Sequence, residues 1–270
     1  MAIAVSALHI YPVKGLKAID VAEARCTERG LVHDRRFMLV EPSGEFLTQR
    51  VLPRMATVWT DIEDDSLVLS APDRDPVALP LEPAEGEPLP VHVWRSHCEA
   101  LAPSPEADAW LSDYLGIACR IVYMPETTRR ESNPEYAPGR IVSFADGYAC
   151  LATSEASLAD LNARLIAKGR RALPMNRFRP NVVLAGSPAF AEDEWKEVVV
   201  GGATFGAAKP SGRCEVTTTD QSTGEVMGPE PLATLASYRQ HAEFGIMFGI
   251  NWFVLETGTI RVGDPVEVRR

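Results

Sequence analysis

The sequence predicts a mainly β protein of the α+β class, built on β-barrels that carry a few helices at their periphery. Short segments that are β-branched or alternate between apolar and polar residues recur along the chain, separated by Gly, Pro or Asp. Only three segments show the apolar spacing of an amphipathic helix. With 270 residues, of which 46% are hydrophobic, the chain can bury a full core without disulfide or metal staples.

The first half of the chain contains five predicted strands, at residues 2–10, 37–41, 55–62, 67–71 and 90–94. The segment 41–45 combines proline, serine and glycine, which predicts a hairpin turn leading into a partner segment at residues 46–49. Residues 72–90 are rich in Pro, Asp and Glu, and this composition predicts a surface loop.

Three segments are predicted to be helices. Residues 104–106 supply an N-cap serine, a first-turn proline and a first-turn acid, and Gly116 is the predicted C-cap. Residues 154–168 form the clearest helix, because their leucines share one face and acidic side chains precede basic ones. Residues 231–241 predict a shorter third helix.

After residue 180 the strand pattern returns, at residues 181–185, 197–200, 204–208, 215–219, 252–256 and 259–262. The sequence shows no internal repeat and no low-complexity tract. We place a domain boundary near residues 115–125, which divides the chain into one domain of residues 1–120 and a second of residues 121–270.

Composition and charge exclude several classes of protein. The net charge of −10 argues against a nucleic-acid-binding surface, although a few converging arginines would still suffice for a small anion. No apolar stretch approaches the ~20 residues of a membrane span, and the first residues lack the basic segment of a signal peptide. The cysteines are scattered and form no CxxC pair, which argues against disulfides and zinc and favours a reducing cytoplasm. They are Cys26, Cys98, Cys119, Cys150 and Cys214.

The densest candidate for chemistry is the segment 211–220, which contains Arg213 and Cys214. The neighbouring arginine favours the thiolate, which is the form that binds metals. Taken alone, a free cysteine on a strand is more often a buried core residue. The polar flanks weaken that alternative here. Because no CxxC pair or nearby histidine offers a second ligand, a metal on Cys214 would have to bring its other ligands with it.

Other polar clusters are weaker on their own. Arg177 and Arg179 alternate on a predicted extended segment and would point the same way, as phosphate recognition requires, but surface salt bridges explain them equally well. Lys14 beside Gly15 could hold an anion, although a Lys-Gly turn is commonplace. The triplet at residues 146–148 is by itself only a turn signal. No nucleophile elbow, Rossmann fingerprint or Walker loop is present, and we expect each of the scattered histidines to be structural or exposed.

Together these clusters resemble the MOSC family, and most closely its two-part members. In those proteins an N-terminal MOSC β-barrel domain, here residues 1–120, packs on the MOSC domain proper, here residues 121–270. The mitochondrial amidoxime-reducing components and their bacterial relatives belong to this group. The resemblance rests on residues 11–14, Gly30-Leu31, Asp34-Arg35, Gly44, residues 48–50 and Pro53, and then on residues 154–158, 177–181, Arg213-Cys214, residues 218–220, Thr223-Gly224 and residues 258–264.

The resemblance implies a molybdenum–pterin cofactor and assigns residues to it. Cys214 would ligate molybdenum, and the pterin dithiolene and oxo groups would supply the other ligands. Cations would contact the cofactor's phosphate or pterin, and further residues would line the pterin. Asp220 would handle protons near the metal. The cofactor-binding residues are Lys14, Gly15, Arg35, Asp146, Gly147, Tyr148, Arg179, Asn181, Arg213 and Cys214.

This chain departs from the family pattern at three places. Many relatives carry Ser at the position of Gly15, and Gly147 with Tyr148 replaces the Thr-Ser pair expected in the animal proteins. These differences bear on substrate preference. The cysteine cluster of the iron–sulfur domain that follows the MOSC part in some bacterial relatives is also missing, so electrons are expected from a separate ferredoxin, flavin or haem protein.

The resulting hypothesis is a reductase that removes an oxygen atom from small N-hydroxylated or other N-oxygenated substrates, with S-oxygenated compounds as an extension. It would act without contact to nucleic acid or membrane. The alternative is a protein that carries the cofactor, or transfers sulfur to it, without turnover. A third interpretation is a purely structural β-barrel with no ligand.

Overall fold

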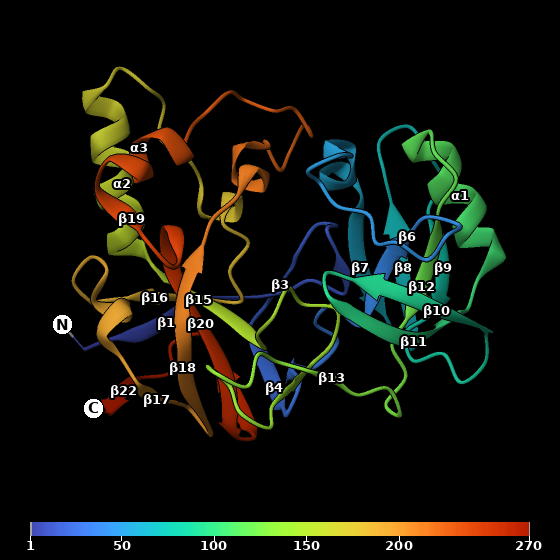
Figure 1. The fold of residues 1–270 in the computed structure, drawn as a ribbon, viewed down its shortest axis with the longest axis horizontal. Helices are drawn as coiled ribbons and strands as arrows, with labels where there is room; N and C mark the ends of the chain where they lie inside the picture. The colour runs from blue at the N-terminus through green and yellow to red at the C-terminus, as the bar shows by residue number, and fades with distance from the viewer. Residues whose placement is uncertain (1, 270) are drawn as a thin grey trace.

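The structure is a computed structural model that describes residues 2–269, and it confirms a mainly β fold with peripheral helices. Figure 1 shows two regions side by side. One contains the largest sheet, with helices α2 and α3 above it, and the other contains two smaller sheets with helix α1 at its outer side. None of the helices in residues 2–269 is long and apolar enough to cross a membrane.

The largest sheet follows the order β22-β17-β18-β20-β15-β16-β1-β3, with β19 added at β20. The Val5 amide donates to the Asp264 carbonyl at 3.0 Å, and the Gly263 amide donates to the Val5 carbonyl at 2.8 Å. These bonds connect β1 to the segment before β22, so the path curls round like a barrel. The strands are β1 (Ala4–Ile10), β3 (Ile19–Val21), β15 (Cys150–Ser154), β16 (Val182–Ala185), β17 (Glu197–Val200), β18 (Ala203–Gly212), β19 (Gln240–His241), β20 (Gly245–Glu256) and β22 (Val266–Arg269).

The second region pairs two sheets of order β10-β11-β12-β6-β2 and β7-β8-β9. Their facing side chains, such as Phe37, Leu69 and Ile121, bury one apolar core together with Leu111 of helix α1. The strands are β2 (Val13–Lys14), β6 (Phe37–Val40), β7 (Trp59–Glu63), β8 (Ser66–Ser70), β9 (Val77–Pro80), β10 (Glu87–Val93), β11 (Ser96–Ala102) and β12 (Arg120–Tyr123).

Two small sheets complete the fold, with orders β21-β4-β5 and β13-β14. They contain β4 (Glu23–Thr27), β5 (Gly30–Leu31), β13 (Arg130–Glu131), β14 (Ile141–Val142) and β21 (Gly258–Arg261). The chain therefore crosses between regions more than once, because β1 pairs with β16 and β4 pairs with β21, both from the second half of the sequence. The predicted division at residue 120 stays a prediction.

The three helices begin and end close to the predicted residues. Helix α1 (Pro105–Leu115) has Ser104 as its N-cap, whose side chain accepts from the Ala107 amide, and Gly116 as its left-handed C-cap. Helix α2 (Glu155–Ala167) is capped in the same way by Ser154, and α3 (Leu232–Arg239) is the short third helix. Short 3₁₀ segments are η1 (Pro53–Thr57), η2 (Met175–Arg177), η3 (Ala191–Glu194) and η4 (Glu215–Thr218).

Three sequence predictions of secondary structure were wrong in part. Residues 215–219 are not a strand, because the Thr217 amide and hydroxyl both donate to the Cys214 carbonyl and close a 3₁₀ turn. Residues 55–62 begin inside η1 and only then form β7. Residues 72–90 contain β9, whose Val77 and Leu79 are buried against β8, and the start of β10.

Candidate functional site

A cavity of about 500 Å³ lies where the two regions meet. Its walls come from residues 14–15, 35, 47–50 and 94 on one side, and from residues 133, 145–148, 150–151, 178–179, 181, 209–214, 216, 243–244 and 251 on the other. The structure brings ten of the eleven predicted site residues to this cavity, all except Asp220. They are Lys14, Gly15, Arg35, Asp146, Gly147, Tyr148, Arg179, Asn181, Arg213 and Cys214.

Cys214 lies at the end of strand β18, as the N-cap of the 3₁₀ turn η4. It is half-buried, whereas the other four cysteines are buried. Cys150 also borders the cavity, but burial raises its pKa well above the usual value. Cys214 is therefore the thiol that a ligand in the cavity can reach. No group of three or more His, Cys, Asp or Glu side chains in residues 2–269 could hold a metal ion.

Two half-buried arginines reach the cavity without an ion pair to a carboxylate in the described part of the chain. Arg179 donates to the Leu16 carbonyl at 2.6 Å and to Gln221 Oε1 at 3.1 Å, and burial lowers its pKa to about 10. Arg213 donates to the Phe178 carbonyl at 2.7 Å, its Nε has no hydrogen-bond partner, and burial lowers its pKa. Half-buried cations that are hydrogen-bonded only to neutral acceptors favour an anionic ligand.

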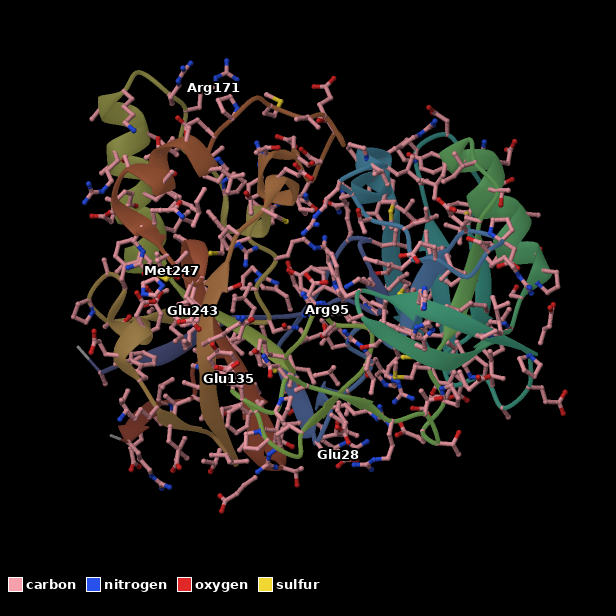
Figure 2. The ribbon with its side chains drawn as sticks, in the orientation of Figure 1. Glu28, Arg95, Glu135, Arg171, Glu243 and Met247 are labelled. Atoms are coloured by element: carbon pink, nitrogen blue, oxygen red, sulfur yellow. The ribbon has the colours of Figure 1, made fainter. Side chains whose placement is uncertain are left out.

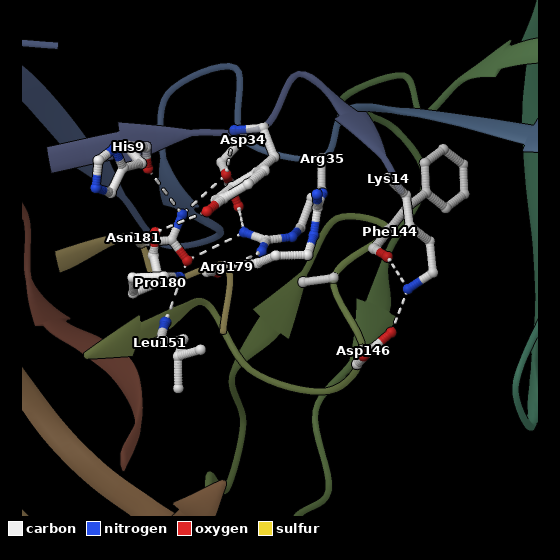
Figure 3. Close-up of polar contacts among 12 residues, drawn as sticks. His9, Lys14, Asp34, Arg35, Phe144, Asp146, Leu151, Arg179, Pro180 and Asn181 are labelled. Carbon is white, nitrogen blue, oxygen red and sulfur yellow. Dashed lines mark hydrogen bonds and ion pairs between the residues drawn. The ribbon is translucent and has the colours of Figure 1, made fainter. Parts of the chain in front are cut away.

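Arg35 is held by a network that also orients Asn181 (Figure 3). Its Nη1 donates to Asp34 Oδ2 at 2.5 Å and to Asn181 Oδ1 at 3.0 Å. The guanidinium groups of Arg35 and Arg179 each lie over the Tyr11 ring, 4.5 and 4.4 Å from its centroid. Burial alone would lower the pKa of Arg35, but Asp34 and the neighbouring groups raise it. Tyr11 and Asp34 thus hold two like charges at one end of the cavity.

Lys14 and Asp146 form a second polar cluster (Figure 3). The Lys14 ammonium donates to the Phe144 carbonyl at 2.9 Å and to the Asp146 carboxylate, which also accepts from the Trp94 indole at 3.0 Å. Burial lowers the pKa of Lys14. Surrounding protein would raise the pKa of Asp146, but the charge and hydrogen bond of Lys14 lower it below the usual range. The carboxylate therefore stays anionic, with 76% of the side chain exposed.

The backbone is strained at this cavity. Seven residues other than glycine have a left-handed backbone within residues 2–269, and three of them border the cavity: Arg35, Trp94 and Arg179. Gly15 is also left-handed, with φ +86°, and its carbonyl accepts from Gln49 Nε2 at 2.6 Å. A Cβ at Gly147 would meet open space, so this glycine widens the cavity. Strained positions of this kind cluster at functional sites.

Asp220 and Arg177 lie elsewhere than the sequence indicated. Asp220 is outside the cavity lining, and its carboxylate accepts from the Ser222 amide at 2.9 Å and lies 3.7 Å from Arg177. Its side chain thus organises a turn. Arg177 belongs to η2 and is buried, so the expectation that Arg177 and Arg179 point the same way was wrong. Arg177 donates to the Thr217 carbonyl at 3.3 Å and does not border the cavity, whereas Arg179 does.

The comparisons with known proteins agree with this geometry. Residues 2–118 match the model of the MOSC N-terminal beta barrel domain, and residues 139–267 match that of the MOSC domain. The chain is 37% identical to mitochondrial amidoxime-reducing component 1 of Mus musculus, over 97% of this chain and 81% of that protein. The chain belongs to the MOSC family.

Two further matches differ more in length or in sequence. The chain is 34% identical to the molybdenum cofactor sulfurase of Oryza sativa subsp. japonica, over 92% of this chain but only 32% of that protein. Among solved structures, the YUAD protein from Bacillus subtilis aligns over 98% of this chain and 94% of its own, with 10% identity and a TM-score of 0.41. The matches as a whole associate the chain with the molybdenum cofactor.

The residues of this MOSC chain fit such a cofactor. A half-buried thiol stands beside Arg213, whose Nε is unpartnered, and Arg179 lacks a carboxylate partner within the described residues. The thiol suits a soft metal that brings its own remaining ligands, and the cations suit a phosphate. The cavity of about 500 Å³ lies within the range of small-molecule and cofactor sites, roughly 300–1,000 Å³.

Arg130 is a MOSC-site residue that the sequence analysis missed. It is buried, and its Nη1 donates to the Ser143 carbonyl at 2.8 Å and to the Ala145 carbonyl, while Nη2 donates to the Asp146 carbonyl at 3.1 Å. Arg130 thereby fixes the loop that presents Asp146 to Lys14. No sequence signal marked it, because its partners are backbone carbonyls thirteen to sixteen residues away.

We expect cofactor-free protein to react with a thiol reagent first at Cys214. The other cysteines are buried, and burial raises the pKa of Cys26 to about 12 and also raises the pKa values of Cys98, Cys119 and Cys150. Brief iodoacetamide treatment followed by peptide mass spectrometry measures the order of labelling. Equal labelling of a buried cysteine in folded protein would contradict the accessibility assigned here to Cys214.

Proposed function

We propose that this protein binds the molybdenum–pterin cofactor and reduces small N-hydroxylated or other N-oxygenated substrates, with S-oxygenated compounds as an extension. The observation that carries the proposal is the position of one accessible thiol, Cys214, in a cavity beside two half-buried arginines without carboxylate partners in residues 2–269. Relatives named amidoxime-reducing components support the reaction class. We propose the cytoplasm as its location, where five unpaired cysteines are stable.

Each side chain of the cavity has a proposed task. Cys214 would hold the metal through its thiolate, and Arg179 and Arg213 would bind the cofactor's anionic groups. Arg35, fixed by Asp34, would orient the pterin together with Asn181. When bound, the cofactor supplies oxygen-atom transfer at molybdenum.

Protons and electrons must be supplied for the reduction to balance. Converting an N–OH group to N–H releases the oxygen as water and consumes an electron pair and two protons. Asp146 borders the cavity as an anion between Lys14 and Trp94, so it can orient a substrate N–H or a water that delivers protons. We keep Asp220 out of the proposed mechanism, because its carboxylate belongs to a turn outside the cavity.

We propose that electrons come from a separate redox protein of the ferredoxin, flavin or haem type. The sequence contains no dinucleotide fingerprint and no cysteine set for an iron–sulfur cluster. Redox encounters of this kind are small and transient, so a large apolar docking surface is not required.

The function is tested with protein produced in a host that makes the cofactor. We expect reduced viologen to drive conversion of benzamidoxime to benzamidine, and NADH or NADPH alone to support none. Liquid chromatography measures the benzamidine formed with reduced viologen and with NADH or NADPH alone. Turnover by the flavin-free chain with NADH alone would contradict the proposed electron supply.

The similarity to molybdenum cofactor sulfurase favours a second candidate, a protein that carries the cofactor or transfers sulfur to it without turnover. The same experiment separates the two candidates. Molybdenum-loaded protein that reduces no N-oxygenated compound, even with viologen, would support the carrier and contradict the reductase.

A further inference from the structure

Lys209 is one of six cationic side chains that border the cavity within the described residues, and the network around Tyr11 and Asp34 does not include it. It lies on strand β18, and every residue from 209 to 214 borders the cavity. At a rise of ~3.3 Å per residue, the Cα atoms of Lys209 and Cys214 are at most ~16 Å apart. A lysine side chain and a flat substrate can span that separation together.

Strand β18 pairs irregularly with strand β20 on both sides of Lys209, and this irregularity sets the direction of the lysine side chain. The register with β20 (Gly245–Glu256) shifts between Ala207 and Lys209, and again between Pro210 and Gly212. The Lys209 carbonyl accepts from Asn251 Nδ2 at 3.2 Å, which fixes the strand between the shifts. Bulges of this kind redirect side chains beside active sites.

The Lys209 ammonium stands among aromatic rings. Its Nζ lies 5.1 Å from the Tyr136 centroid, 5.8 Å from that of Phe244 and 5.9 Å from that of Tyr148. Within residues 2–269 it has no ion pair and donates no side-chain hydrogen bond that would occupy its three donors. Ring faces stabilise the charge but leave those donors free for a ligand.

The cavity carboxylate Glu243 is hydrogen-bonded to a tyrosine and not to Lys209. Glu243 borders the cavity, but it accepts from the Tyr136 hydroxyl, and this hydrogen bond is the main reason that the pKa of Tyr136 is raised to about 12. In Figure 2, Glu243 and Glu135 lie in the part of the view occupied by β18 and β20. Glu243 thus makes no ion pair with Lys209 in the described residues, and the three ammonium donors stay available beside the aromatic rings.

We propose that Lys209 is a specificity-determining residue that binds a carboxylate on a planar aromatic N-oxygenated substrate. The substrate ring would pack against Phe244 or Tyr148, which both border the cavity, and its N–O group would face Cys214. This inference rests on the proposed function and deepens it, because it selects anionic aromatic compounds from the wider N-oxygenated class.

The experiment compares two probes, benzamidoxime and 4-carboxybenzamidoxime, on the molybdenum-loaded protein. Isothermal titration without reductant measures binding, and viologen-driven turnover measures kcat/KM. We expect the unmodified protein to prefer the carboxylated probe. Lys209→Met should reduce affinity and kcat/KM for that probe about tenfold, the effect of losing one charge-assisted hydrogen bond, and leave benzamidoxime nearly unchanged.

Matched variants separate charge from folding. Lys209→Arg should retain most of the preference, and Lys196→Met, which removes an exposed lysine next to β17, should change nothing. Lys209→Gln serves in the same way if Lys209→Met folds poorly by circular dichroism. Equal binding of both probes by the unmodified protein, or an unchanged preference in Lys209→Met (or in Lys209→Gln where it replaces Lys209→Met), would overturn the inference. If the protein binds the carboxylated probe preferentially but shows no viologen-driven turnover, the assignment of Lys209 to carboxylate binding is supported and the proposed reductase function is contradicted.

Discussion

Replacing Cys214 by serine is expected to abolish molybdenum-dependent turnover while the protein stays folded. A hydroxyl is a harder and far less acidic ligand than a thiol, so it cannot replace the thiolate on a soft metal centre. The side chain is half-buried at the start of a 3₁₀ turn, and the turn is closed by the Cys214 carbonyl, which the substitution keeps. Viologen-driven turnover, metal content and circular dichroism measure the three consequences.

Cys150→Ala is the sharpest control for Cys214→Ser, because Cys150 also borders the cavity but is buried in strand β15. We expect Cys150→Ala, and likewise the Ala variants of Cys26, Cys98 and Cys119, to keep turnover whatever their cost in stability. Normal activity in Cys214→Ser would contradict the proposal that Cys214 is the metal ligand. A second cysteine essential for turnover would indicate a different chemistry.

Arg179→Ala is expected to weaken cofactor retention by roughly ten- to a hundredfold, the equivalent of ~1.5–3 kcal/mol for a lost charge-assisted hydrogen bond. Its guanidinium is half-buried and hydrogen-bonded to neutral acceptors, so no carboxylate competes with an anionic ligand for its charge. Lys14→Ala should act in the same direction and also release Asp146, which Lys14 holds. Molybdenum content after exhaustive dialysis measures retention.

Arg261→Ala is the matched control for this pair, since Arg261 is exposed and pairs with exposed Glu23 at 2.9 Å. We expect no loss of cofactor in it, and a greater loss in the Lys14→Ala, Arg179→Ala double variant than in either single one. Full molybdenum occupancy in both single variants after dialysis would contradict the assignment of Lys14 and Arg179 to the cofactor site.

Local chemistry explains which elements the sequence could predict. Helix α1 was predictable from both ends, because Ser104 caps it through its own hydroxyl and Gly116 adopts the left-handed conformation that other residues avoid. Strands such as β6 were predictable because they are apolar and follow turn residues. These signals lie within a few residues of the element that they determine.

The rest depended on tertiary contacts that the sequence does not display. The composition of strand β9 is typical of a loop, and the strand forms because Val77 and Leu79 are buried against β8. The sequence of residues 215–219 is typical of a strand, but hydrogen bonds such as that from the Thr217 amide to the Cys214 carbonyl close a 3₁₀ turn there. The residues of the site also divide into those that the sequence could predict and those that depend on tertiary contacts. Cys214 and the motif cations were predictable by resemblance, whereas Arg130, which binds backbone carbonyls of a distant loop, was not.

Elemental analysis tests the central claim most directly, because it asks only whether the cavity holds molybdenum. The protein is expressed with the cofactor pathway intact, purified without chelators and dialysed. We predict stoichiometric molybdenum in the unmodified chain and a marked loss in the Cys214→Ser, Arg179→Ala double variant. Absence of molybdenum from folded, unmodified protein, under conditions that load another molybdenum enzyme in the same host, would contradict the account.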